Sequence, residues 1–157
     1  MKFKVSEDVD APRPLVWDRM TDFSGLEADA RGRGATVTRV GNWTEPCEGA
    51  EWRGEVKVRG KVRPLSARIT RFVPEEICLI ESRIGGMACL HEMSFVALTP
   101  ETTRVATVLD LSAQTLTARL ILQTMKLARG RVMQRLQGII ARQGNAVVAE
   151  YRKAKRD

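Results

Sequence analysis

The sequence predicts an α+β fold in which a long C-terminal helix covers one face of an antiparallel sheet of about seven strands. Three observations support this prediction. Hydrophobic residues alternate with polar ones near the start of the chain and again through most of residues 34–111. Two short helical segments are expected between these regions, and from Thr115 onward the hydrophobic period is that of a helix.

The first strand is expected over residues 2–9, where Phe3 and Val5 alternate with charged or polar neighbours. Asp10, followed by two prolines, then predicts the start of a short helix, because Asp caps helices and prolines are tolerated in a first turn. A second short helix or an irregular link is expected over residues 22–33.

Turn residues divide the central region into strands. Arg59-Gly60 and Gly85-Gly86 predict tight hairpin turns. The strands expected around these turns span residues 35–40, 50–59, 61–72, 77–84, 87–98 and 103–111. Together they predict an antiparallel meander.

One long helix is expected to begin at Thr115 and to cover one face of the sheet. Its hydrophobic residues are expected on one side: Leu116, Leu120, Met125, Val132, Leu136, Ile139, Ile140 and Val147. Gly130, Gly138 and Gly144 are poor helix formers, and either a close approach to the sheet or a bend would explain them.

The excess positive charge lies entirely in the last quarter of the chain. Of the 157 residues, 1–114 hold 16 basic and 17 acidic side chains, whereas 115–157 hold 10 basic and 2 acidic ones, so that −1 and +8 give the net charge of +7. We expect residues 1–150 to form a single domain and residues 151–157 to be a frayed basic tail. Because the rest of the chain is nearly neutral, a nucleic-acid-binding protein is not expected.

Several classes of protein and site are not indicated. No stretch approaches the ~20 apolar residues of a membrane-spanning helix, and the N-terminus lacks a signal-peptide core, so a cytoplasmic protein is expected. Cys47, Cys78 and Cys89 form no CxxC pair, and a single histidine, His91, cannot supply a multi-histidine metal site. A phosphate-binding loop and a nucleophile elbow are also lacking, and neither a metal nor a cofactor is expected.

Four parts of the chain carry a resemblance to a known superfamily: VSEDVDAPRPLVWDRMTDFSGLE, GAEWRGEVKVRGK, IESRIGGM and the final helix. In this order they resemble the helix-grip fold of the START-like or SRPBCC superfamily, which includes polyketide cyclases/dehydrases and lipid-transfer domains. The resemblance implies a curved sheet that wraps around the long C-terminal helix, and a cavity between them that holds a hydrophobic molecule. The chain departs from the family at residues 28–34, where ADARGRG replaces a frequent aromatic residue and proline.

Alternation along the strands indicates which side chains would face such a cavity. In the strand over residues 50–59, for example, Trp52 and Val56 alternate with charged residues. The residues expected to contact a ligand are Trp52, Val56, Ile80, Cys89, His91, Met93, Leu109, Met125 and Arg129. Ordinary core packing is the alternative for each hydrophobic member.

His91 is the candidate acid/base catalyst, because the ordinary pKa of histidine is ~6.5. The alternative is a core histidine with a backbone or Ser/Thr partner, since no carboxylate at a matched spacing would orient it. A bulge before Glu92 would turn it outward. Arg129 falls within the apolar stripe of the helix, so it either holds a ligand carboxylate or extends to the surface beside Gly130.

Two further groups of basic residues are expected to face solvent. Arg59, Lys61 and Arg63 lie at a hairpin tip on the convex side of the sheet, and Arg131, Arg135 and Arg142 lie on one flank of the long helix. The second group raises the possibility of membrane contact, because an apolar helix with a basic flank can lie on an anionic membrane.

Three functions fit these features. The first is a module that binds or transfers a hydrophobic molecule, such as a lipid, polyketide or isoprenoid-like compound, while the basic C-terminal region contacts anionic membrane. The second is an enzyme similar to polyketide cyclases/dehydrases, with His91 as acid/base and Arg129 orienting the substrate. The third is a protein- or ribosome-interaction module that uses the basic helix. The missing catalytic constellation favours binding over catalysis, and the oligomeric state is not indicated.

Overall fold

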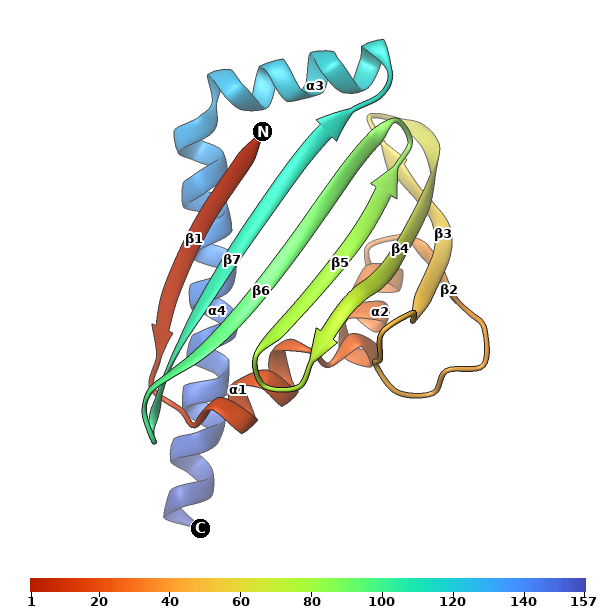
Figure 1. Ribbon diagram of the computed structural model, residues 1–157. Coiled ribbons are helices and arrows are strands. Elements are labelled where there is room, and N and C mark those ends of the chain that lie inside the picture. The colour runs from red at the N-terminus through yellow and green to blue at the C-terminus, as the bar shows by residue number, and fades with distance from the viewer.

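A computed structural model describes residues 1–157 and shows a seven-stranded antiparallel sheet. The strand order is β1-β7-β6-β5-β4-β3-β2, so the first strand lies beside the last and the others form a meander (Figure 1). The strands are β1 (Lys2–Val9), β2 (Thr36–Val40), β3 (Glu51–Val58), β4 (Lys61–Val73), β5 (Ile77–Ile84), β6 (Met87–Thr99) and β7 (Thr102–Ala113). The fold class and the strands predicted from the alternation are confirmed.

Two glycine-containing turns set the hairpins. Arg59 and Gly60 both have positive φ, 51° and 80°, which is the backbone of a turn whose twist matches that of the strands it joins. Gly85 begins the β5–β6 turn with a φ of 57°. The registers of β6 with both neighbours are unbroken around His91, so no bulge turns this residue away from the helices.

The helices α1 (Arg13–Met20) and α2 (Phe23–Gly32) follow β1 and lie behind the sheet in Figure 1. Asp22 caps α2, since its side chain accepts a hydrogen bond from the backbone N–H of Gly25. The cap role expected for Asp10 is wrong, because α1 begins after Pro12 without a side-chain cap.

The best-packed part of the core lies beneath α1. The ring centroid of Trp17 lies 5.0 Å from that of Phe95 and 5.1 Å from that of Phe72. Cys78 and Met93 are buried in the same cluster. Aromatic packing therefore closes this end of the inner face, which is the face of the sheet toward the helices.

The prediction of one continuous C-terminal helix is wrong, because the helix breaks at Ala128, whose backbone is not helical (φ −101°, ψ 26°). The two parts are α3 (Leu116–Leu127), which crosses one end of the sheet, and the long α4 (Arg129–Arg156), which runs beside β1 (Figure 1). Leu116 and Leu120, expected inside, are 73% and 56% exposed. The prediction of a common hydrophobic side is wrong for them, because at about 100° per residue they lie far around α3 from Met125.

The β5–β6 turn fixes the start of α3. The backbone N–H of Gln114 donates to the carbonyl of Gly86 at 2.8 Å. A Cβ on Gly86 would lie only 2.3 Å from Oγ1 of Thr115, the residue that caps α3 through the N–H of Ala118. Only glycine allows the cap to approach the turn this closely, and α3 therefore begins directly over the hairpin tip.

Close packing and an ion pair hold α4 against the opposite end of the fold. Gly144 meets β1, where an added Cβ would lie 2.9 Å from Cγ2 of Val9. Nearby, Arg19 of α1 donates two hydrogen bonds to the carboxylate of Glu150. The helix thus covers the β1 edge of the inner face and leaves the central strands uncovered.

The C-terminal residues continue this helix. The Tyr151 hydroxyl and the Lys155 ammonium both donate to Glu101, in the turn between β6 and β7. Because α4 extends through Arg156, the expectation of a frayed tail over residues 151–157 is wrong. None of the helices is both long enough and apolar enough to cross a bilayer.

Candidate functional site

The larger apolar pocket on the inner face lies beneath α3, and we name it the α3 pocket. Its volume is 310 Å³. It is lined by Val58, Arg59, Arg63, Ile84, Gly85, Gly86, Met87, Leu111, Thr115, Thr117, Ala118, Ile121 and Met125. The tips of two hairpins therefore form one wall, and the inward face of α3 forms the other.

A second apolar pocket, named the α2 pocket, lies beside α2 and has a volume of 220 Å³. Its lining residues are Phe23, Leu26, Glu27, Ala30, Val37, Trp52, Leu65, Ala67 and Ile80. Glu27 is its only charged member, and it is turned toward protein partners. Its carboxylate accepts hydrogen bonds from Nε1 of Trp52 at 2.9 Å and from Nε of Arg39 at 2.7 Å.

These partners determine the ionisation of Glu27. Burial acts to raise its pKa, but the hydrogen bonds from Trp52 and Arg39, together with the charges of Arg39 and Arg31, outweigh burial. The pKa of Glu27 therefore lies below its ordinary value, and the carboxylate remains ionised at neutral pH.

The two pockets adjoin on the inner face. Leu65, which lines the α2 pocket, is the cross-strand partner of Ile84, which lines the α3 pocket. A second row of paired residues, Ala67–Ser82–Cys89–Leu111, also runs from one pocket to the other. Ser82 and Cys89, in the middle of this row, are only half-buried. We call the two pockets and the strand surface between them the inner groove.

His91 lies on the same face, one row further toward α1. Its cross-strand partners are Ile80 and Leu109, and its Nε2 is buried without a hydrogen-bond partner. Burial lowers the pKa of His91, so the imidazole is neutral at neutral pH. Thr107, on the neighbouring strand, also has a buried hydroxyl without a partner. Because Met93 pairs with Thr107, the two orphaned polar groups are diagonal neighbours.

Neither inward-facing cysteine has the environment of a nucleophile. Burial raises the pKa of Cys78 to about 11. Burial also raises the pKa of Cys89, a hydrogen bond with Ser82 opposes this shift, and the negative charge of Asp110 adds to it. Both thiols therefore remain protonated at neutral pH.

The structure groups most of the predicted ligand contacts on one face. Trp52 and Ile80 line the α2 pocket and Met125 lines the α3 pocket. The half-buried inner residues between and beside the pockets are Val56, Cys89, His91 and Leu109. Met93 belongs instead to the buried core beneath α1.

Arg129 is apart from the inner groove. Its guanidinium donates to the backbone carbonyl of Lys2 at 2.7 Å and lies over the ring of Phe3, 5.0 Å from its centroid. The side chain is exposed at the β1 edge. Arg129 therefore extends to the surface, which is one of the two positions expected for it, and does not reach into the inner groove.

Arg59 and Arg63 both line the α3 pocket, although the sequence pattern predicts a convex position for them, and for Arg63 this prediction is wrong. The alternation of β4 places Arg63 on the same face as Leu65, Ala67 and Ile69, and its partner on β3 is the inner residue Val56. The sequence did contain this information, because Arg63 shares the two-residue period of the inner hydrophobic residues of β4. Its position near a hairpin tip favoured the interpretation as an exposed residue.

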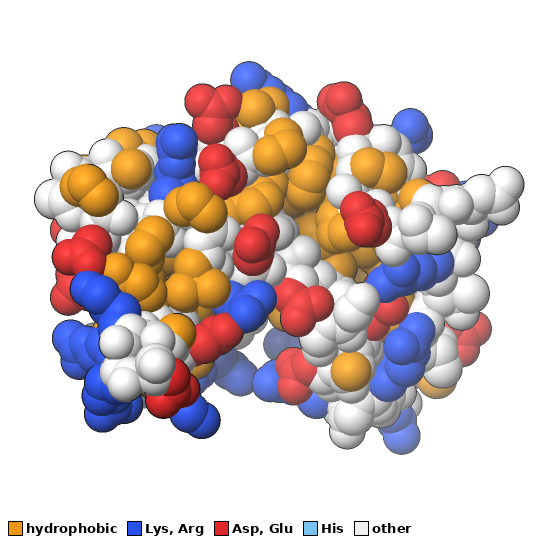
Figure 2. Space-filling model, turned by 90° about the horizontal axis from the view of Figure 1, so that it is seen from below, with side chains coloured by type: hydrophobic (Ala, Val, Ile, Leu, Met, Phe, Trp, Pro, Cys, Tyr) orange, Lys and Arg blue, Asp and Glu red, His pale blue; other side chains and the backbone are white.

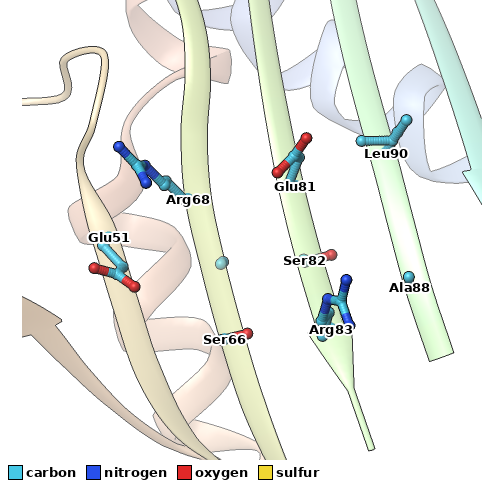
Figure 3. A pocket seen from close by; sticks show the side chains of 9 residues that line it. Glu51, Ser66, Arg68, Glu81, Ser82, Arg83, Ala88 and Leu90 are labelled. Carbon is cyan, nitrogen blue, oxygen red and sulfur yellow. The ribbon is translucent and has the colours of Figure 1, made fainter. Parts of the chain in front are cut away.

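Depressions elsewhere on the surface are more polar. On the convex face, Figure 3 shows Arg68 on the strand between those of Glu51 and Glu81, in a depression of 230 Å³ lined mainly by charged and small side chains. Seen from below in Figure 2, the molecule is also hollowed, and charged side chains of both signs lie beside hydrophobic ones there. The inner groove is distinguished by its mainly apolar lining.

Comparisons with solved structures identify the fold. A protein from Thermus thermophilus matches with a TM-score of 0.64 and 15% identity, over 96% of this chain and 99% of that one. The Zhui aromatase/cyclase from a Streptomyces species matches with a TM-score of 0.62 and 17% identity, over 98% and 94% of the two chains. A START superfamily protein from Mycobacterium smegmatis matches with a TM-score of 0.55 and 13% identity, over 88% and 98%.

These likenesses show that the chain has a START-like helix-grip fold, as the order of its sequence elements predicted. The sequence matches no described family profile and no curated protein. At these low identities the comparisons establish the fold alone, and the chemistry of the inner groove is the guide to function.

Proposed function

We propose that the protein binds a hydrophobic small molecule, such as a lipid, polyketide or isoprenoid-like compound, in the inner groove. The observation that carries this proposal is the pair of adjoining apolar pockets on the face of the sheet toward the helices. Ligand pockets typically have volumes of about 300–1,000 Å³ and a mainly apolar lining, and the α3 pocket with its 310 Å³ falls in this range.

The incomplete cover of the sheet supports the same proposal. If the helices sealed the inner face, its hydrophobic side chains would be fully buried, yet Ile84 is 40% exposed. Val56, Ile80 and Leu109 are half-buried. An apolar molecule that filled this space would remove these surfaces from water, which would stabilise the complex by about 25 cal/mol for each Å² covered.

The proposal can be tested on protein purified from its host, by native mass spectrometry and then by organic extraction of any retained molecule. A Cys89→Phe variant places a larger side chain in the middle of the groove, whereas Leu90→Phe places the same side chain on the convex face and is the matched control. We expect a hydrophobic molecule on the wild type and on Leu90→Phe, and less of it on Cys89→Phe. A wild type that purifies empty and binds nothing from a broad lipid panel contradicts the proposal.

Catalysis similar to that of an aromatase/cyclase is a second candidate, and His91 is the observation that favours it. The neutral imidazole has a buried Nε2 without a partner on the inner face. This nitrogen could donate a hydrogen bond to a substrate oxygen or accept one from a substrate hydroxyl. No carboxylate hydrogen-bonds to it, so the usual orienting partner of a catalytic base is missing. If His91→Ala leaves the turnover of every accepted ligand unchanged, this candidate is lost.

The exposed face of α3 supports contact with an anionic membrane as part of the binding cycle. Leu116, Leu120 and Leu127 form one stripe of this helix and are 73%, 56% and 91% exposed. Residues 115–149 contain six Lys or Arg residues and no Asp or Glu. Exposed leucines beside positive charges fit an anionic lipid surface. They fit a second copy of this protein less well, because the two positively charged helices would repel each other.

A further inference from the structure

The charged groups of the α3 pocket are of one sign. Two arginines, Arg59 and Arg63, are among its lining residues, and none of the other lining residues is acidic. Neither guanidinium forms an ion pair or a hydrogen bond within the protein. Other arginines of the chain, such as Arg39 and Arg104, have carboxylate partners at 2.7 and 2.8 Å.

Arg63 is the more informative of the two, because it breaks the pattern of its strand. It belongs to the inner set of β4, which is otherwise hydrophobic next to the pocket, and it is half-buried. A Cβ placed on Gly85 would lie 3.4 Å from Cδ of Arg63, so the aliphatic part of the side chain packs against the β5–β6 turn. Local violations of a hydrophobic pattern are expected at functional sites.

Arg59 approaches the same pocket from the adjacent hairpin. It occupies the first position of the β3–β4 turn with a φ of 51°, in the left-handed region that few residues other than glycine adopt. Its side chain is exposed. The turn therefore presents one cation at the rim of the pocket, while Arg63 presents another from the wall.

We propose that the α3 pocket receives an amphiphilic anion. The carboxylate or phosphate of this ligand pairs with Arg59 and Arg63, and its hydrocarbon part lies over Ile84, Met87 and Leu111 beneath α3. Arginine suits this role because its guanidinium donates two parallel hydrogen bonds to a carboxylate or phosphate. The inference rests on the proposed binding function and adds to it the chemical class of the ligand.

Isothermal titration calorimetry with three probes of equal chain length tests the inference: dodecanoate, dodecyl phosphate and dodecanol. We expect both anions to bind at least tenfold more tightly than the alcohol at low salt, with the advantage shrinking as salt is added. The tighter anion identifies the head group. An Arg63→Gln variant should weaken binding of both anions by about tenfold or more and that of dodecanol by a much smaller factor.

Lys57→Gln is the matched control, because Lys57 is an exposed cation on the convex face of the same hairpin. It should change none of the three affinities. Thermal unfolding of each variant verifies that it is folded, and an Arg59→Gln/Arg63→Gln double variant gives the combined effect.

The outcomes separate this inference from the proposed function. If dodecanol binds as tightly as the anions, and Cys89→Phe weakens all three, the groove binds hydrophobic molecules but the inference about the arginines is overturned. The inference is also overturned if the double variant retains the full affinity for both anions. If no probe binds and the protein from its host carries no ligand, both proposals fail.

Discussion

The indole Nε1 of Trp52 donates a hydrogen bond to Oε1 of Glu27 at 2.9 Å and thereby joins β3 to α2 at the wall of the α2 pocket. Both side chains are buried, at 6% and 9% exposed. The same carboxylate oxygen also accepts from Arg39 of β2. One acidic residue thus connects a helix and two strands beside the proposed ligand site.

A Glu27→Gln variant should lower the free energy of unfolding by about 1–3 kcal/mol at neutral pH, since buried hydrogen bonds to a charged acceptor are lost or weakened. Urea unfolding measures the difference. Glu55→Gln, at an exposed position of β3 without an ion pair, should change stability by less than about 0.5 kcal/mol. Equal effects of the two substitutions would contradict the role given to Glu27.

The stability difference between the wild type and Glu27→Gln should depend on pH. The pKa of Glu27 is lower in the folded protein than in the unfolded chain, so its stabilisation is complete above the ordinary value of 4.5. It is lost as the pH falls below this value and through the lowered pKa. Urea unfolding of both proteins across this range should show the gap narrowing in acid. If the stability difference between the two proteins instead grows in acid, the pKa of Glu27 is not lowered by folding, and the prediction is contradicted.

Two glycines of α4 should respond oppositely to alanine. The Cβ of Gly144→Ala would meet the buried Val9 at 2.9 Å, and overpacking of about 1–3 kcal/mol should outweigh the gain in helix propensity. Gly138 has only the end of Arg142 within 4 Å, at 3.8 Å, so Gly138→Ala should gain about 1 kcal/mol. Thermal unfolding of both variants measures the contrast, and stabilisation by Gly144→Ala would show that α4 does not press on β1 here.

The inner set of several strands could be predicted from the sequence because charged residues mark the opposite face, such as Glu81 and Arg83 in β5 and Glu92 in β6. That alternation correctly placed His91, Cys89 and Ile80 toward the helices. The break at Ala128 is only partly indicated by the sequence: a bend is one of the two explanations for Gly130, the second residue of α4, but no proline marks the position and the hydrophobic period continues from α3 into α4. The contact of Thr115 with Gly86 fixes where α3 begins and so places this helix over the end of the sheet.

Arg63 is the part of the candidate site that the sequence analysis missed. With α3 turned across the end of the sheet, Met125 faces the α3 pocket, and Leu120, on the other side of the same helix, is exposed. Arg63 becomes a wall of this pocket instead of part of a solvated hairpin tip. The alternation of β4 already places Arg63 on the inner face, but the position of α3 over the hairpin tips, which makes a pocket there, depends on contacts between distant segments.

We expect His91 to lower the stability of the fold and to strengthen the binding of a ligand. A His91→Leu variant removes a buried polar group that has no partner, so it should raise the free energy of unfolding by about 1–3 kcal/mol. The same change should weaken binding of any ligand that hydrogen-bonds to Nε2. Chemical unfolding and calorimetry with the extracted ligand measure the two effects. Loss of stability in His91→Leu would show that the imidazole has a protein partner.

The membrane contact proposed for α3 can be tested by vesicle co-sedimentation. A Leu120→Gln/Leu127→Gln variant should bind less to vesicles that contain anionic phosphatidylglycerol, whereas Leu90→Gln on the convex face should bind as the wild type does. Replacing Arg131, Arg135 and Arg142 by Glu should also reduce binding at low salt, because these cations would otherwise attract the anionic surface. Equal sedimentation of all these proteins would leave the helix without this role.

The inner groove itself is tested most directly by methyl NMR of the protein titrated with dodecanoate and dodecanol. We predict shifts for the groove methyls of Leu65, Ile80, Ile84, Leu111 and Ile121. The exposed methyls of Leu90, Val96 and Leu98 on β6 should not move. Shifts confined to these β6 methyls, or no shifts with any hydrophobic probe, would contradict a ligand site between the sheet and its helices.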